Sequence, residues 1–81
     1  MIEVTRKNWD KEVVQFKTPV LVYFFASWCQ PCHQMSPVLD DTEFDSDGST
    51  KFVKINIQGN EGITETYLVQ TLPTLMLFKN G

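Results

Sequence analysis

The run VLVYFFA, at residues 20–26, constrains the fold more than any other part of the sequence. It is continuously apolar and rich in β-branched and aromatic residues, and it lacks the alternation of a strand with one wet face. Such a run is typical of a strand that is buried on both faces. We therefore predict a sheet that has helices on each side, so that both faces of this strand are covered.

Further strands are expected on either side of this run, at residues 2–5, 51–57 and 71–78. The second of these alternates, with Val53, Ile55 and Ile57 on one face and Lys54 and Asn56 on the other. The third is entered through Pro73.

Helical segments are expected between the strands. Their apolar stripes are Trp9, Val13 and Phe16; Cys32, Met35 and Leu39; and Ile63 with Tyr67. Asn8 is a candidate N-cap for the first helix, and Pro37 is expected to kink the second. The polar run from Asp40 to Thr50 is expected to lead out of the second helix into a turn. The order β-α-β-α-β-α-β indicates one α/β domain over residues 1–81.

Charge and hydropathy exclude several classes of function. The formal net charge is −3 at pH 7, which disfavours a nucleic-acid partner, because such proteins present a basic face. No apolar run approaches the roughly 18 residues of a membrane span, and no basic segment leads into an apolar signal core. We expect no membrane partner and a cytoplasmic location.

The segment SWCQPCHQ, at residues 27–34, places Cys29 and Cys32 three residues apart. A structural zinc site needs four ligands, and the only other nearby candidate is His33, which points about 100° away from Cys32 on a helix. No metal is therefore expected within one chain. A structural disulfide closing so short a loop would stabilise the fold by only about 2 kcal/mol; it stays open as an alternative.

A reversible redox couple accounts for more of these residues. A thiol attacks a disulfide as its thiolate, and the N-terminus of a helix stabilises that charge. Cys29 falls where strand gives way to helix, and Pro31 suits the first helical turn because its missing N–H has no partner to lose there. Cys32 lies on the apolar stripe. We therefore expect an exposed attacking thiol at Cys29 and a shielded resolving thiol at Cys32.

With these residues, the chain resembles the thioredoxin family. The segments PVLVYFFASWCQPCHQMSPVLD, KFVKINI and LPTLMLFKNG, and the opening IEVT with NWDKEVV, match the order and spacing of that family. The resemblance implies the thioredoxin fold, a three-layer α/β/α arrangement with a central mixed sheet. It implies that Cys29 attacks and Cys32 resolves, and that the Leu72–Pro73 bond is cis and packs against the cysteines. It also implies a thioredoxin-reductase-type electron donor and no bound cofactor.

The sequence departs from the family at positions that should tune the reaction. Gln30 stands where the family usually has glycine, His33 where it has lysine, and Tyr23 where it has a buried aspartate whose usual companion is Lys54. Gln30 should change the potential and partner fit. A charged His33 or Lys54 near the thiols would favour a thiolate. Tyrosine is a poor base near neutral pH, so Tyr23 should slow the resolving step.

The resemblance also implies a sheet edge. The family continues with a further strand and an amphipathic helix, which are not expected here, although Asn80-Gly81 is a strong hairpin-turn signal. The strand at residues 71–78 would then lie uncovered and favour self-association.

The function expected is thiol–disulfide oxidoreduction, in which protein disulfides are reduced through a Cys29/Cys32 cycle. Residues expected to contact the disulfide-containing client proteins are Trp28, Gln30, Pro31, Thr71, Leu72 and Pro73. Two alternatives stay open. An oxidase or isomerase would run the same chemistry at a higher potential, and a binding module would use the apolar rim with weak activity.

Overall fold

The computed structural model describes residues 1–81 and contains seven elements. In chain order they are β1 (Ile2–Val4), η1 (Asp10–Val14), β2 (Val20–Phe25), α1 (Gln30–Asp45), β3 (Lys51–Asn56), α2 (Glu61–Thr66) and β4 (Thr74–Phe78). The expected alternation of strands and helices is confirmed. None of the helices has the length and apolar character needed to cross a membrane.

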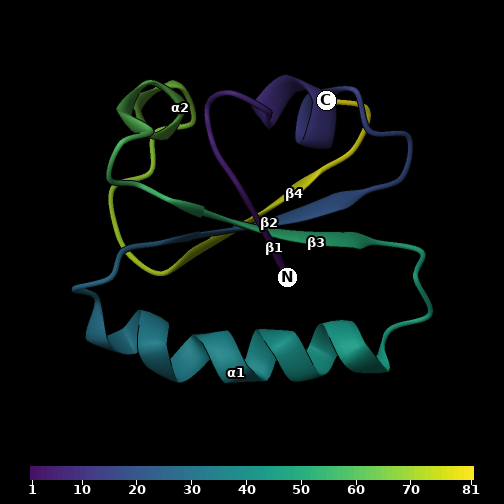
Figure 1. Cartoon of the computed structure of the whole chain (residues 1–81), viewed down its shortest axis with the longest axis horizontal. Coiled ribbons are helices and arrows are strands. Elements are labelled where there is room, and N and C mark those ends of the chain that lie inside the picture. Colours follow the sequence, from purple (N-terminus) through teal and green to yellow (C-terminus); the bar gives the residue numbers. More distant parts are fainter.

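The strands form one mixed sheet in the order β1-β3-β2-β4. β3 pairs in parallel with β1 and β2, whereas β4 pairs antiparallel with β2. The apolar run is therefore an interior strand, flanked by β3 and β4. Figure 1 shows α1 below the sheet and η1 with α2 above it, so the expected three layers are confirmed.

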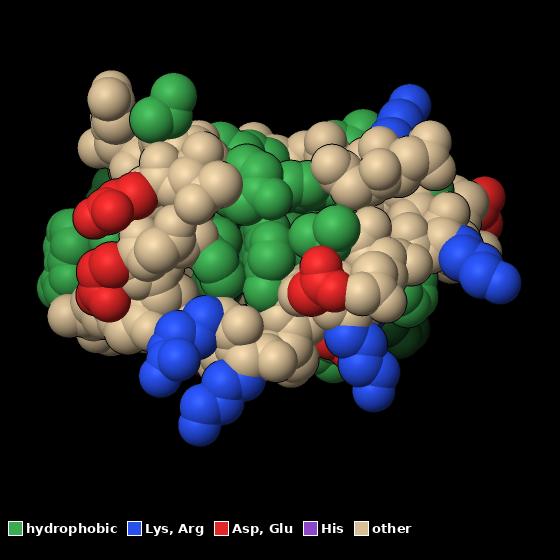
Figure 2. Space-filling view, turned by 90° about the horizontal axis from the view of Figure 1, so that it is seen from above, with side chains coloured by type: hydrophobic (Ala, Val, Ile, Leu, Met, Phe, Trp, Pro, Cys, Tyr) green, Lys and Arg blue, Asp and Glu red, His purple; other side chains and the backbone are tan.

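The larger core lies between the sheet and the pair η1 and α2. It contains Trp9 and Val13 from the first helical segment, with valines, Phe24, Ile55 and Phe78 from all four strands. Trp9, Tyr67 and Phe78 pack ring against ring, with centroids 5.1 to 5.6 Å apart. Figure 2 shows hydrophobic side chains between the two helices on this face. These aromatic contacts join η1, α2 and β4.

The first helical segment differs from its prediction in two respects. It is a π-type turn, in which the Gln15 N–H donates to the Asp10 carbonyl at 2.8 Å. A wider turn shifts later residues around the axis, so Phe16 leaves the stripe and is exposed while Trp9 and Val13 stay buried. The Asn8 cap is also wrong, because the Asn8 Oδ1 accepts the Thr5 N–H at 2.7 Å and closes the preceding turn.

The second helix is longer than the polar run suggests. α1 continues through the acidic residues to Asp45 and passes Pro37 as one continuous helix. Asp40 and Asp41 lie on its exposed side, and the Thr42 hydroxyl donates to the Val38 carbonyl at 2.8 Å. A polar stretch on the solvent face of a helix does not end the helix, so the predicted exit at Asp40 is wrong.

The chain after α2 returns to the sheet through a cis Leu72–Pro73 bond, as the resemblance implies. β4 begins at Thr74, directly after this proline. Asn80 and Gly81 have φ angles of 58° and 90°. These positive values are typical of the turn that an Asn-Gly pair favours.

Candidate functional site

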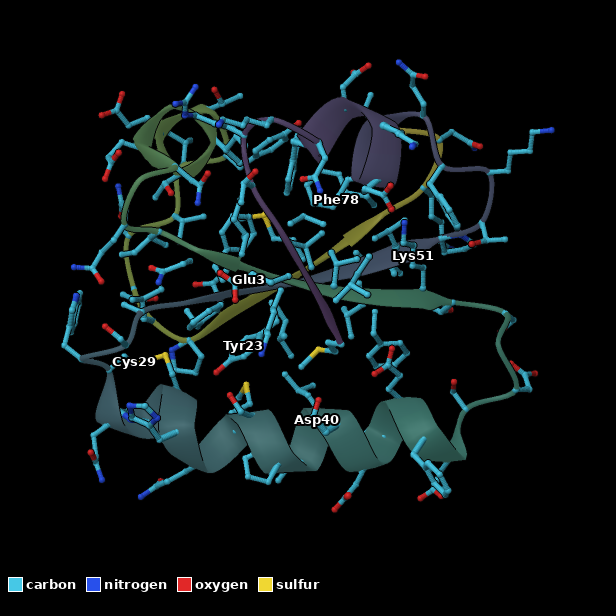
Figure 3. The ribbon with its side chains drawn as sticks, in the orientation of Figure 1. Glu3, Tyr23, Cys29, Asp40, Lys51 and Phe78 are labelled. Atoms are coloured by element: carbon cyan, nitrogen blue, oxygen red, sulfur yellow. A yellow bond between two sulfur atoms is a disulfide. The ribbon has the colours of Figure 1, made fainter.

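The cysteines lie where the chain takes opposite directions from two neighbouring strands. β2 leads down into α1, whereas the adjacent, parallel β3 leads up toward α2 (Figure 1). In α/β sheets, such a divergence opens a crevice at the carboxyl ends of the strands, and ligands bind there. Figure 3 shows Cys29 at this edge, at the start of α1.

Cys29 is the N-cap of α1 and is disulfide-bonded to Cys32. Their Cα atoms are 5.3 Å apart, within the usual range for a disulfide. The Cys29 Sγ accepts the Cys32 N–H at 3.2 Å. Pro31, in the first turn, has no N–H to leave unpaired. A thiolate at Cys29 would therefore receive a backbone hydrogen bond and the positive end of a 16-residue helix.

The expected contrast in exposure between the two cysteines is wrong for the disulfide form. Cys29 is only 4% exposed and Cys32 only 2%, because both belong to one buried cluster with Tyr23, Ala26 and Leu39. The two cysteines differ in whether they border a groove on the molecular surface. Cys29 lines a surface groove, and Cys32 does not.

This Cys29 groove has a volume of about 290 Å³ and is mainly apolar in its lining. Its residues are Trp28, Cys29, Gln30, Pro31, Ile57, Val69, Gln70 and Leu72. Trp28 is 65% exposed and forms part of the wall. Leu72 also packs against the cluster that holds both cysteines.

Four of the six residues expected to contact a client therefore lie in the groove, namely Trp28, Gln30, Pro31 and Leu72. Thr71 is exposed outside it. Pro73 lines a second hollow, on the other side of Pro31, with Met35 and Val38.

Sequence reasoning missed Ile57, Val69 and Gln70. Ile57 follows β3 directly. Ligand sites form at the carboxyl ends of parallel strands, and this rule could have identified Ile57.

Tyr23 is buried beneath the first turn of α1, with 1% of its surface exposed. In Figure 3 its side chain points from the sheet toward that helix. The hydroxyl donates to the Cys32 carbonyl at 2.8 Å and lies 3.0 Å from the Ser36 Oγ. The Ser36 hydroxyl itself donates to the same carbonyl at 3.0 Å. Ser36, which sequence reasoning also missed, and Tyr23 thus hold the Cys32 peptide group from two elements.

Lys54 and His33 occupy different surroundings. Lys54 pairs in register with Tyr23, and its Nζ lies 5.7 Å from the centroid of the Phe25 ring. No hydrogen bond or ion pair joins Lys54 to the cysteines. The His33 Nε2 donates to the Ser27 carbonyl at 2.7 Å, immediately before Trp28. No group of three or more His, Cys, Asp or Glu side chains is arranged to hold a metal ion.

Comparison with known proteins matches the whole chain, residues 1–81, to the family model described as Thioredoxin. A thioredoxin of Rickettsia bellii is 41% identical over 78 residues, which are 96% of this chain and 74% of that protein. A thioredoxin of Pseudomonas aeruginosa is 41% identical over the full chain and 75% of its own length. A chloroplastic thioredoxin M-type of Triticum aestivum is 40% identical over the full chain and 46% of its length.

Proposed function

Because this chain belongs to the thioredoxin family and is an oxidoreductase that reduces protein disulfides through Cys29 and Cys32, we propose that Cys29 attacks and Cys32 resolves. One observation carries the assignment: Cys29 lines the groove that an incoming disulfide can enter, and Cys32 does not. The helix N-terminus and the Cys32 N–H support a thiolate on Cys29.

In the first step, the Cys29 thiolate attacks one sulfur of a client disulfide. A bond forms between the Cys29 Sγ and that sulfur, the client S–S bond breaks, and the departing client thiolate takes a proton from water. The Cys32 thiol then gives its proton to water, and its thiolate attacks the Cys29 Sγ. The Cys29–Cys32 disulfide forms, the bond between the Cys29 Sγ and the client sulfur breaks, and that departing client thiolate takes a proton from water. The client leaves with both sulfurs reduced, and its two electrons come from the Cys29 and Cys32 thiols.

The Cys29 groove is proposed to hold the client segment that carries the disulfide. Its apolar wall, Trp28, Pro31 and Leu72, supports this role because burial of apolar client surface would exclude water around the reacting sulfurs. Gln30 lies in the same groove and contributes a polar contact. Thr71 and Pro73, on either side of Leu72, are proposed to meet the client backbone beyond the groove.

The proposed partners are disulfide-containing client proteins and a thioredoxin-reductase-type electron donor, which would make the chain a carrier in electron transport. We propose a cytoplasmic location, which the bacterial relatives support; the chloroplastic relatives make organelle targeting the alternative to test. Localisation of the tagged protein in the cells that make it distinguishes the two.

Self-association through β4 is a further proposal. β4 pairs only with β2, and Leu75 and Leu77 are 41% and 54% exposed. An edge strand with exposed apolar side chains favours pairing with a second chain. Sedimentation equilibrium over a range of concentrations should therefore detect a dimer, and a strictly monomeric protein at high concentration would refute this proposal.

The assignment of the two thiols is tested with insulin as the client and dithiothreitol as the recycling reductant. We expect Cys29→Ser to abolish catalysed reduction, because the attacking sulfur is gone. Reduced Cys32→Ser, freed of dithiothreitol before it meets the client, should instead accumulate a mixed disulfide between Cys29 and the client, visible on a non-reducing gel. Trapping of client by Cys29→Ser rather than by Cys32→Ser would reverse the roles.

A further inference from the structure

A further depression lies at the carboxyl ends of the parallel strands, the same end of the sheet as the Cys29 groove. This polar hollow has a volume of about 350 Å³ and no hydrophobic residue in its lining. It is lined by Glu3, Thr5, Arg6, Lys7, Asn56, Gln58, Gly59 and Asn60. These residues come from β1 and β3 and from the loops that follow their carboxyl ends. The redox mechanism uses none of them.

The backbone around the polar hollow is held by one hydrogen bond between its two loops and by others within each loop. The Arg6 N–H donates to the Asn60 Oδ1 at 2.8 Å, and the Asn60 Nδ2 donates to the Asn56 carbonyl at 2.7 Å. Asn60 is the only buried polar residue of the chain. Thr5 is fixed in turn by the Asn8 side chain. The Arg6 and Lys7 side chains therefore project from a backbone that is already positioned.

The polar hollow also differs in charge from the rest of the molecule. Arg6 and Lys7 form no ion pair within the chain, and Glu3 is the one carboxylate in the lining. The hollow thus carries +2 − 1 = +1, and the remainder of the chain carries −3 − 1 = −4. An acidic partner is repelled by most of the surface and attracted here, which favours one orientation of approach.

The two depressions meet at consecutive residues of one segment. Ile57 lines the Cys29 groove, and Gln58 lines the polar hollow. The Ser27 hydroxyl donates to the Gln58 Oε1 at 3.3 Å, which ties the loop before Trp28 to the rim of the hollow. A client segment that lies in the groove with its disulfide at Cys29 therefore has the polar hollow beside it.

We propose that the polar hollow binds an acidic side chain that flanks the disulfide of a client protein. Arg6 and Lys7 supply the charge, and the amide side chains of Asn56 and Gln58 supply neutral hydrogen-bonding groups. The proposal rests on the proposed function, because it assigns a specificity contact to the same client. It makes this protein selective for acidic flanking sequence although its own net charge is negative.

The test uses three peptide dimers that carry one intermolecular disulfide and differ only at the positions flanking the cystine, with Glu, Gln or Lys there. At low salt, we expect kcat/KM to be about threefold to tenfold higher for the Glu peptide than for the Gln peptide, as two exposed charge contacts would give. This preference should shrink at high salt. In the double variant Arg6→Gln/Lys7→Gln, the Glu and Gln peptides should have equal kcat/KM.

The matched control is Lys17→Gln/Lys79→Gln, which removes the same charge at the opposite edge of the sheet, before β2 begins and after β4 ends. It should keep the preference for Glu. Equal rates on the Glu and Gln peptides in the unmodified protein would overturn the proposal, as would a preference that survives in Arg6→Gln/Lys7→Gln. Failure to reduce any of the three peptides would instead contradict the proposed function itself.

Discussion

Two buried or half-buried hydroxyl groups, on Tyr23 and Ser36, converge on the carbonyl of the proposed resolving cysteine. Each hydroxyl has one proton, so the three contacts among these groups share two protons. Loss of one hydroxyl leaves the other to serve the Cys32 carbonyl, whereas loss of both removes its side-chain partners. The two residues should therefore be energetically coupled.

We predict that Tyr23→Phe lowers the free energy of unfolding by about 1 kcal/mol, the usual net contribution of a neutral hydrogen bond. The double variant Tyr23→Phe/Ser36→Ala should lose more than the sum of the two single variants. Urea unfolding of the four proteins measures this coupling. Tyr67→Phe is the control, because the Tyr67 hydroxyl forms no hydrogen bond although its ring packs against Trp9. Additive losses would contradict the shared network.

His33 acts on a loop, in our interpretation, rather than through its charge. Its Nε2 holds the Ser27 carbonyl at 2.7 Å, one residue before the exposed Trp28 of the groove wall. We predict that His33→Ala slows reduction of a protein disulfide about threefold, because Trp28 is then less well positioned. The alkylation rate of Cys29 by iodoacetamide in the reduced protein should be unchanged.

Gln34→Ala, at the next exposed position of α1, serves as the control and should leave both rates unchanged. If His33→Ala slowed alkylation as much as it slowed protein reduction, His33 would act on the thiolate through its charge. The sequence suggested a charge effect because His33 is adjacent to Cys32. It gave no sign that the His33 ring reaches back to the Ser27 carbonyl.

For individual residues, the sequence predicts the chemistry of a side chain better than it predicts where that side chain lies. The Cys-x-x-C spacing and Pro31 indicate the redox pair and the start of a helix. The contacts of Tyr23 with Ser36 depend on how the helix is rotated against the sheet, and the sequence does not contain that angle. Near-equal burial of the cysteines follows from their packing in one cluster with Tyr23, Ala26 and Leu39, which is another tertiary effect.

At the scale of elements, η1 is joined to the start of β3 by one ion pair. The Lys51 Nζ donates to the Glu12 Oε1 at 2.7 Å and to the Glu12 carbonyl at 3.0 Å, and lies 3.7 Å from the centroid of the Phe16 ring. The hydrogen bond from Lys51, with the attraction of its charge, lowers the pKa of Glu12 below its usual 4.5. The ion pair thus stabilises an element that does not have regular α-helical hydrogen bonds.

A carboxylate whose pKa is lowered by folding contributes stability above its unfolded pKa, and this contribution is lost as the pH falls through the folded value. We therefore predict that Glu12→Gln lowers the urea midpoint at pH 7, and that the difference from the unmodified protein disappears well below pH 4.5. Glu65→Gln, an exposed change in α2 that breaks no ion pair, should show no such dependence. An unchanged difference at pH 3 would mean that Glu12 acts through packing.

The order of strands and helices could be read from the sequence because most elements have an apolar stripe at helical or strand spacing and β2 is a continuous apolar run. The ends of the elements could not be read in this way. α1 continues past Asp40, because acidic residues are as compatible with the solvent-facing side of a helix as with the loop that follows one. The π-type turn of η1 depends on the hydrogen bond between Gln15 and Asp10, and both residues also fit an ordinary helix.

At the scale of the whole molecule, the topology places the reactive pair. β2 and β3 are neighbours whose helices lie on opposite faces, and Cys29 and the Cys29 groove lie where they diverge. The polar hollow lies beside this groove, at the carboxyl ends of β1 and β3. The coverage of both faces of the run at residues 20–26 was predictable from its composition. The polar hollow was not predictable, because only the order of the strands in the sheet shows that the loops that follow β1 and β3 are adjacent.

Cys29 and Cys32 form a couple that donates electrons to protein disulfides. The most direct test is the reduction potential of this couple, measured by equilibration with a dithiol buffer of known potential and quantified by alkylation. We predict a value near the roughly −270 mV that is characteristic of thioredoxins. A value between about −180 and −120 mV, where isomerases and oxidases lie, would contradict assignment of the protein as a reductase.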